Sequence, residues 1–504
     1  MNRATIWMKN VSIKIINIIA IIGICVITVL LLFYRLHMAL NNDSKVIYTN
    51  TLLIIPIIVL VVLLFVFAGR IIRKYSEKRI FTFFSIIYIV ASFFLVLNVD
   101  STLRADQELI HKHALLMNQG NYEGLLNGHY LAFNPVQLGF ASYVRLFCLI
   151  SENPVILFVL NIIWTFLIYL MIWKISTLII ESELCRKYVI IFEFAFLPTF
   201  FMILYAYGQV PGLSCMLICS YFFIKYLKYN KVTDLMLFIV VFILACILKN
   251  NYMIAGIVYG IVILLYVIEN KRRLKMLVII PIIVIGMTYP SKIITNYYRS
   301  VSGIDFDDGE PISSYFAMGL HWNEYAVVGG GYDGYTFDNY TESDYNTSIA
   351  DTNAKEDIKN TLNIFINDPY YAYTFFKYKL IGTWCEPLFG AVECGPLEFY
   401  GQYTHNIFIQ SIYTDGYLYL IAERYMLAYN IIIFILSAAF LIRKFFLKKV
   451  QNIYEIMPAL YFIGGFLFHL ISETQARYMS VYMVPLILYA AVMFAKLFEK
   501  YLKI

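Results

Sequence analysis

The feature that most constrains this chain is a series of long apolar runs separated by short polar segments. A helix needs about 20 mainly apolar residues to cross the hydrocarbon core of a bilayer, and twelve runs come close to that length. Charged residues make up 14% of the 504 residues, whereas about 25% is usual for soluble proteins. The runs therefore predict an all-α polytopic membrane protein with about twelve transmembrane helices, extracytoplasmic loops and interfacial helices. We expect the transmembrane helices at residues 12–34, 50–69, 80–98, 154–176, 188–206, 211–226, 233–248, 252–269, 276–296, 422–442, 455–471 and 478–495.

The positions of lysine and arginine predict how the chain is oriented. Basic clusters follow every second run, for example at 70–79 and 271–275, and cytoplasmic loops are the ones enriched in such residues. We therefore expect both termini in the cytoplasm. Segment 136–151 is apolar but short and contains Arg145, which predicts an interfacial helix on the outer surface. If this segment crossed the membrane, the later basic loops would face outward.

Three polar segments then share the outer face: 99–153, 297–421 and the short turn Ser472–Arg477. Segment 297–421 contains 17 acidic and 5 basic residues. The net charge of +6 comes from clusters at helix ends, so we expect membrane lipid and no nucleic acid as a partner. The predicted parts are an N-terminal two-helix addition (1–69), a transmembrane core that includes the external loop 99–153 (70–296), an extracytoplasmic region (297–421) and C-terminal transmembrane helices (422–504).

Several features of the external segments leave two interpretations open. The aromatic and acidic stretch 313–340 is suited to sugar binding, and equally to an ordinary surface loop. Cys385 and Cys394 form a disulfide if their loop faces an oxidising compartment, or remain free thiols. His111 and His113 are two positions apart on a predicted helix and do not share a face, so we expect no metal site.

Two carboxylates in the first external segment are candidates for proton chemistry. Asp106 lies just beyond the third run and Asp100 lies six residues before it. A positioned carboxylate can act as a general base towards a hydroxyl group. The alternative is a solvated carboxylate favoured near a helix N-terminus by the helix dipole.

Charged residues at the membrane boundary form a second candidate group. Arg477 and Glu473 lie four positions apart in the turn before the last run. Arg477 is a candidate phosphate contact, because its planar guanidinium binds two oxygens at once, and the alternative is an ordinary i,i+4 ion pair with Glu473. Lys249 ends the seventh run on the outer side, where it is either a second phosphate contact or a lysine that reaches to the interface. His469 is nearby, and a hydrogen-bonded core histidine is its simplest interpretation.

The sequence contains no P-loop, no dinucleotide-binding fingerprint and no nucleotide-sugar signature. Nucleotide sugars are not available outside the cytoplasm, so an enzyme acting there on sugars is expected to use a lipid-linked donor.

The first external segment resembles that of GT-C superfamily membrane glycosyltransferases, in particular the bacterial branch related to protein O-mannosyltransferases and aminoarabinose transferases. In this sequence Asn134 stands before Pro135 where that branch usually has tyrosine, and Gln107 follows Asp106 where glutamate is common. Two later pieces extend the resemblance across most of the chain. The matching residues are Asp106, Ile110, Ala114, Leu115, Gly120, Tyr122 and the run from Tyr130 through Gln137 to Gly139, then Met318-Gly319 with Gly329–Tyr332, then Glu473, Arg477-Tyr478 and Pro485.

The resemblance implies an inverting glycosyltransferase that uses a polyprenyl-phosphate-linked sugar. It implies Asp106 as the base and Arg477 as the donor-phosphate contact, with no metal and no cofactor. Further contributions are expected from Asp100, Lys249, Glu473, Tyr130, Gln137 and His469. The expected acceptor is a cell-envelope glycopolymer or a protein. Two alternatives remain, namely a polysaccharide polymerase or ligase, and a transporter or flippase of lipid-linked sugar.

Overall fold

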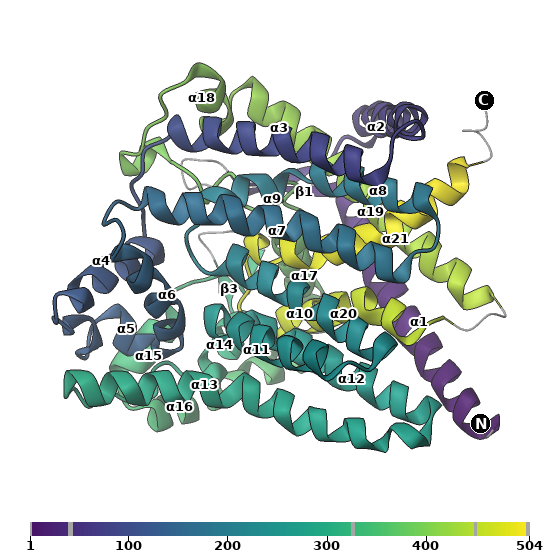
Figure 1. The fold of residues 1–504 in the computed structure, drawn as a ribbon. Helices are drawn as coiled ribbons and strands as arrows, with labels where there is room; N and C mark the ends of the chain where they lie inside the picture. The colour runs from purple at the N-terminus through teal and green to yellow at the C-terminus, as the bar shows by residue number, and fades with distance from the viewer. Residues whose placement is uncertain (1–2, 39–43, 324–327, 448–450, 500–504) are drawn as a thin grey trace.

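The computed structural model describes residues 3–38, 44–323, 328–447 and 451–499, and it is built almost entirely of helices (Figure 1). Among these residues, ten helices are long and apolar enough to cross a membrane. A bent pair, α8 (Glu183–Ala195) and α9 (Leu197–Phe201), and the shorter α11 (Val232–Leu248) account for the other two predicted runs. The protein is therefore an all-α polytopic membrane protein. The ten helices are α1 (Arg3–Phe33), α2 (Thr51–Ile72), α3 (Glu77–Leu97), α7 (Val155–Ile179), α10 (Gln209–Tyr229), α12 (Met253–Glu269), α13 (Ile279–Ser302), α19 (Tyr417–Phe446), α20 (Met457–Ile471) and α21 (Ser480–Phe498).

One end of the bundle carries most of the polar segments, and we call it the polar end. Figure 1 shows α4 (Asp106–Asn118), α5 (Tyr130–Phe133), α6 (Leu138–Cys148), α15 (Tyr335–Glu342) and α16 (Thr347–Asn367) there, on the left. The beginning of α1 and the end of α21 lie at the opposite end. Helix α6 has 11 residues, too few to span a bilayer, in agreement with the interfacial helix predicted at 136–151.

Region 297–421 is largely helical. Besides α15 and α16, it contains α14 (Ile312–Gly319), α17 (Pro369–Trp384) and α18 (Ile407–Tyr413). The described strands form two short hairpins, β1 (Tyr34–Met38) with β2 (Ser44–Tyr48), and β3 (Trp322–Asn323) with β4 (Val328–Gly329).

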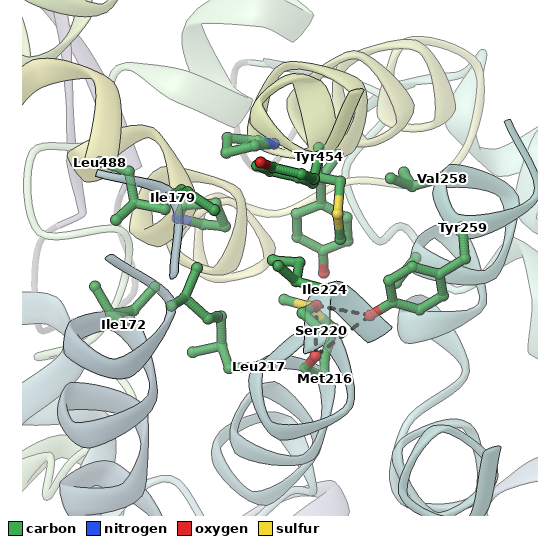
Figure 2. A pocket seen from close by; sticks show the side chains of 16 residues that line it. Ile172, Ile179, Met216, Leu217, Ser220, Ile224, Val258, Tyr259, Tyr454 and Leu488 are labelled. Atoms are coloured by element: carbon green, nitrogen blue, oxygen red, sulfur yellow. Dashed lines mark hydrogen bonds between the residues drawn. The ribbon is translucent and has the colours of Figure 1, made fainter. Parts of the chain in front are cut away.

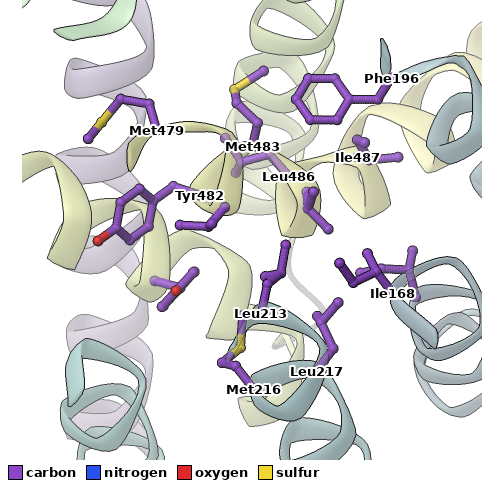
Figure 3. Close-up of a cluster of buried hydrophobic side chains, with 14 of the residues drawn as sticks. Ile168, Phe196, Leu213, Met216, Leu217, Met479, Tyr482, Met483, Leu486 and Ile487 are labelled. Carbon is purple, nitrogen blue, oxygen red and sulfur yellow. The ribbon is translucent and has the colours of Figure 1, made fainter. Parts of the chain in front are cut away.

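The centre of the bundle is α21, whose side chains are buried nearly all round. A helix that is apolar on every side is suited to such a central position. Figure 3 shows Leu486 of α21 facing Leu213 and Leu217 of α10, with Ile168 of α7 beside them. This packing connects the middle of the chain with its last helix.

The fifth predicted span is broken rather than continuous. Helices α8 and α9 meet at Phe196 with a bend of 52°, and Pro198 lies in the first turn of α9. Irregular backbone at membrane depth is tolerated where protein groups satisfy it. The side-chain amide of Asn161 does so, because it donates to the carbonyls of Ile203 and Tyr205 at 3.0 Å each. The break leads the chain into the polar end at residues 205–208.

The first two helices are packed into the bundle. Helix α1 contacts α12, α19 and α20. The hairpin β1–β2 follows it, and the Leu36 N–H donates to the Cys385 carbonyl at 3.0 Å. Arg35 forms an ion pair of 2.5 Å with the buried Glu423. Segment 1–69 thus contributes contacts from one end of the bundle to the other.

A cavity lies between α7, α10, α12, α20 and α21 (Figure 2). Its described lining includes no charged side chain, and its clearest polar contact joins the hydroxyls of Ser220 and Tyr259 at 2.7 Å. The lining includes Ile179, the last residue of α7, and Tyr454, which precedes α20. The cavity therefore extends towards the end of the bundle opposite the polar end.

Candidate functional site

The site is built where the three predicted external segments meet at the polar end. Asp106 is half-buried and begins α4, directly after Ala105, whose φ of 50° is unusual for a residue with a side chain. The next side chain, Gln107, accepts a hydrogen bond of 2.7 Å from the Ala206 N–H. The start of α4 is thereby fixed against the segment that follows the broken helix.

Tyr207 in that segment joins three of the predicted residues. Its hydroxyl lies 2.7 Å from the Tyr130 hydroxyl and accepts a hydrogen bond of 2.8 Å from Gln137 Nε2. The Nζ atom of Lys249 lies 3.9 Å from the centre of the Tyr207 ring, a distance at which a cation is attracted to the aromatic face. Sequence reasoning missed Tyr207, although the polar break in an apolar stretch around Gly208 was a usable signal.

Lys249 connects the carboxylate of Asp106 with the turn at 472–477. Burial lowers the pKa of Lys249 to about 8, the carboxylates of Asp106 and Glu473 oppose this shift, and the Arg477 guanidinium adds to it. Near pH 7 the lysine is therefore still mostly protonated. The structure places Asp106, Lys249 and Arg477 in one electrostatic cluster, which we call the central cluster.

Arg477 presents a planar cation to the same space. Its guanidinium lies 5.7 Å from the centre of the Tyr205 ring and 5.8 Å from that of Tyr478. Its Nε is buried and has no hydrogen-bond partner among the described residues. Glu473 is 8% exposed, and its Oε1 likewise has no partner there. Such buried, unpaired polar atoms are rare in folded proteins and call for a ligand or other partner.

Residues 472–475 lie outside any helix and Ala476–Tyr478 form a single 3-10 turn, so Glu473 and Arg477 do not form the α-helical i,i+4 pair considered above. The Glu473 N–H donates to the Tyr315 carbonyl at 2.8 Å, and the Thr474 N–H donates to the Gly330 carbonyl at 2.9 Å. These bonds attach the turn to α14 and to the segment after β4. A Cβ atom on Gly319 would collide with the backbone of the turn, which explains why this position is glycine.

Lys379 is a buried positioning residue that the sequence did not reveal. Its Nζ donates to the carbonyls of Gly319 and Ser472, the latter at 2.8 Å. Burial lowers the pKa of Lys379 to about 7, and the nearby Glu473 opposes the shift. The lysine therefore connects α17 to the end of α14 and to the start of the turn that carries Arg477.

The polar and ring contacts of Asp100 and His469 are with residues outside the central cluster. Asp100 Oδ2 accepts a hydrogen bond of 2.7 Å from the Tyr403 N–H, and its Oδ1 lies 3.0 Å from His405 Nε2. The buried His469 ring stacks on Tyr478 with 5.6 Å between ring centres. These contacts give Asp100 a role in joining two external segments and give His469 a packing role beneath the turn.

The cysteines and histidines that were left open can now be placed. Cys385 and Cys394 are both buried free thiols. His111 and His113 are buried in α4, and the centres of the His113 and His129 rings are 6.1 Å apart. Across the described residues, no three His, Cys, Asp or Glu side chains are grouped as a metal site.

Neither a family model nor a curated protein matches this sequence. The site must therefore be interpreted from its own chemistry. It belongs to a polytopic membrane protein. It combines the half-buried carboxylate of Asp106 and the buried carboxyl group of Glu473 with two cations beside a group of tyrosines. Lysine and arginine together can bind a phosphate group, and a carboxylate next to them can accept a proton.

Proposed function

We propose that this protein is an inverting glycosyltransferase of the GT-C type. It transfers a sugar from a polyprenyl-phosphate donor to an acceptor hydroxyl at the extracytoplasmic face of the cell membrane. The observation that carries the proposal is the meeting of Asp106, Lys249 and Arg477 at one end of a transmembrane bundle. Each of the three residues comes from a different polar segment, and a lipid-linked phosphate is the anion most available at the membrane boundary.

In this mechanism, Arg477 and Lys249 hold the donor phosphate. The planar guanidinium contacts two phosphate oxygens, and the ammonium group adds a point charge. Asp106 accepts the proton of the acceptor hydroxyl as its oxygen attacks the anomeric carbon from the face opposite the phosphate. The new carbon–oxygen bond forms, the bond to the phosphate breaks, and polyprenyl phosphate leaves with the electron pair. The two cations stabilise the charge that develops on the leaving group.

The distribution of basic residues supports an extracytoplasmic position for the polar end. Arg70 and Arg73 at the end of α2, the segment 271–275 before α13, and Arg443 and Lys444 at the end of α19 all lie at the opposite end of the bundle. Cytoplasmic loops carry such an excess of lysine and arginine. Both termini are then cytoplasmic. A cell-envelope glycopolymer or a protein is the acceptor in this proposal.

The test is sugar transfer by the full chain in membranes that contain the native acceptor. Radiolabelled undecaprenyl-phosphate glucose, galactose and mannose serve as donors for wild type, Asp106→Asn and Arg477→Ala. Loss of a general base lowers rates about 10²- to 10⁴-fold, so Asp106→Asn is expected to lose transfer while it still binds donor. Asp100→Asn is the matched control and is expected to retain most of the activity. Normal transfer by Asp106→Asn would refute this assignment of the base, and a wild type inactive with every donor would refute the proposed function.

A further inference from the structure

The cavity between α7, α10, α12, α20 and α21 opens at the end of the bundle opposite the polar end (Figure 2). Ile179 and Tyr454 are half-buried, and every other described residue of the lining is buried. Ile179 is the last residue of α7, and Tyr454 belongs to the 3-10 turn Ile453–Ile456 before α20. These two side chains therefore mark the mouth of the cavity, which is closed towards the centre of the bundle.

The depth of the cavity follows from the helix that forms one of its walls. Its lining on α10 runs from Met216 to Ile224 (Figure 2), a separation that corresponds to about 12 Å of α-helix. Aliphatic side chains make up most of the described lining. An apolar space between helices excludes water and is a usual place for an apolar ligand. The shape and the lining are suited to one hydrocarbon chain that enters at the mouth.

A lysine lies across this mouth. Lys228 is exposed and follows Ile224 by about one turn of α10. Its Nζ atom donates to the Leu178 carbonyl, next to Ile179, and lies 5.1 Å from the centre of the Tyr454 ring. The same cation is thus adjacent to both half-buried residues of the mouth. An ammonium group has three donors, so two remain for an anion after the bond to Leu178.

The carboxylates near Lys228 do not neutralise it. Glu455 follows Tyr454 in the chain and forms an ion pair of 2.7 Å with Lys444. Glu181 is exposed, so water and salt screen its charge. No ion pair joins Lys228 to another residue in the described part of the chain. The cation at the mouth is therefore suited to the anionic group of a ligand.

The wall of the cavity also carries a hydroxyl group that needs a partner. Tyr461 lines the cavity and is 4% exposed, and its hydroxyl forms no hydrogen bond with the described residues. Buried tyrosine hydroxyls are usually hydrogen-bonded. Tyr461 comes seven residues after Tyr454, in α20 and deeper in the bundle, so the missing partner belongs below the mouth. The ester carbonyl of a phospholipid is such a partner, since it lies between the phosphate and the acyl chain.

We propose that this cavity binds one acyl chain of an anionic phospholipid from the adjacent leaflet, with the lipid phosphate on Lys228 and an ester carbonyl on Tyr461. The leaflet is the cytoplasmic one in the orientation proposed above. Basic pockets between transmembrane helices at that side are suited to anionic headgroups. The site lies at the opposite end of the bundle from the central cluster, so this lipid takes no part in the proposed sugar transfer.

The experiment measures the binding of single lipids to the delipidated full chain in detergent by native mass spectrometry. The probes are dioleoyl phosphatidylglycerol and dioleoyl phosphatidylcholine, which have the same acyl chains and differ in net charge. We expect the wild type to bind phosphatidylglycerol about five- to tenfold more tightly. Lys228→Gln is expected to bind both lipids equally. Lys231→Gln, at an exposed position just beyond α10, is the matched control and should behave as the wild type.

Three variants test the cavity itself. Ala255→Leu fills part of the buried lining, and Ile179→Trp obstructs the mouth. Each is expected to weaken the binding of both lipids about tenfold, because the acyl chain loses apolar contacts. Tyr461→Phe is expected to bind ester-linked and ether-linked phosphatidylglycerol equally, whereas the wild type should prefer the ester-linked form about two- to tenfold. The Tm of each variant without added lipid shows whether it is folded.

The inference is overturned if the wild type binds the two headgroups equally, or if Lys228→Gln keeps the preference. It is also overturned if Ala255→Leu and Ile179→Trp both retain the Tm and the lipid affinity of the wild type. Equal binding of ester-linked and ether-linked lipid by the wild type would overturn the contact with Tyr461. None of these measurements depends on sugar transfer, so the proposed function and this inference are tested separately.

Discussion

The protonation state of Lys249 predicts how strongly donor binding depends on pH. Burial brings the pKa of this lysine to about 8, so about nine-tenths of the molecules carry the charge at pH 7 and about one-tenth at pH 9. If the donor phosphate binds the protonated form, the apparent Kd varies inversely with that fraction. Raising the pH from 7 to 9 is therefore expected to weaken donor binding about tenfold, or about 1.4 kcal/mol.

Two substitutions separate the charge of Lys249 from its shape. Lys249→Arg keeps a cation that does not titrate below about pH 12, so its donor affinity is expected to be constant between pH 7 and pH 9. Lys249→Met keeps the apolar stem and loses the charged hydrogen bond, which is worth about 1.5–3 kcal/mol. We therefore expect binding to Lys249→Met to be weaker by about 10- to 150-fold at pH 7 and insensitive to pH.

The assay is equilibrium binding of a radiolabelled polyprenyl-phosphate monosaccharide to the full chain in lipid nanodiscs, without an acceptor. The donor is a phosphodiester, so its own charge is constant over this range. Lys359→Arg, at an exposed position on α16, is the matched control and should behave as the wild type. A wild-type Kd that is equal at pH 7 and pH 9, or a Lys249→Arg variant that is equally sensitive to pH, would refute the reasoning.

Two further predictions concern how the site is held together. Gly319→Ala places a methyl group against the backbone that carries Glu473, and overpacking of this kind costs about 1–3 kcal/mol. We therefore expect a lower Tm and weaker donor binding. Gly260→Ala is the control, because the space around Gly260 is open, and it should leave both quantities unchanged. Arg35→Ala leaves the buried carboxylate of Glu423 with only His37 Nδ1, at 3.3 Å, as a side-chain partner among the described residues, at a cost of up to about 3–5 kcal/mol. Thermal unfolding in detergent should show a large decrease in Tm, and Arg35→Lys should recover part of it; an unchanged Tm for Arg35→Ala would contradict the role of this pair.

The sequence was most informative about the membrane-spanning helices. Length and hydropathy are local properties, and lipid imposes them on each span separately. The broken fifth span was missed because segment 188–206 is long and mainly apolar, and hydropathy alone does not reveal the bend at Phe196. Pro198 was a usable signal for the break. The hairpin β1–β2 was missed because it is held by partners as distant in the sequence as Cys385.

The sequence indicated candidate site residues where a charged side chain lies at the boundary of a predicted membrane span. Arg477 and Lys249 were recognised because ionised groups at the membrane boundary are costly without a purpose. Asp106 was recognised because a positioned carboxylate can act as a general base and because its segment resembles that of GT-C glycosyltransferases. Tyr207 and Lys379 were missed, since tyrosine and lysine are unremarkable in their own segments. Their importance depends on contacts between segments that are far apart in the chain. The assigned roles of all these residues remain predictions.

The packing of α1 has a consequence for how the protein is made. Asn17 donates to Gln451, a residue 434 positions later, and Arg35 pairs with Glu423, 388 positions later. Translation proceeds at about 5–20 residues per second, so the first helix waits about 20–90 s for these partners to be synthesised. During that time its polar groups need water, lipid headgroups or an insertion factor as temporary partners. The packing of α1 is thus expected to be completed only after the last helices have been synthesised. Chains stalled before α19 should be recognised as unassembled and degraded.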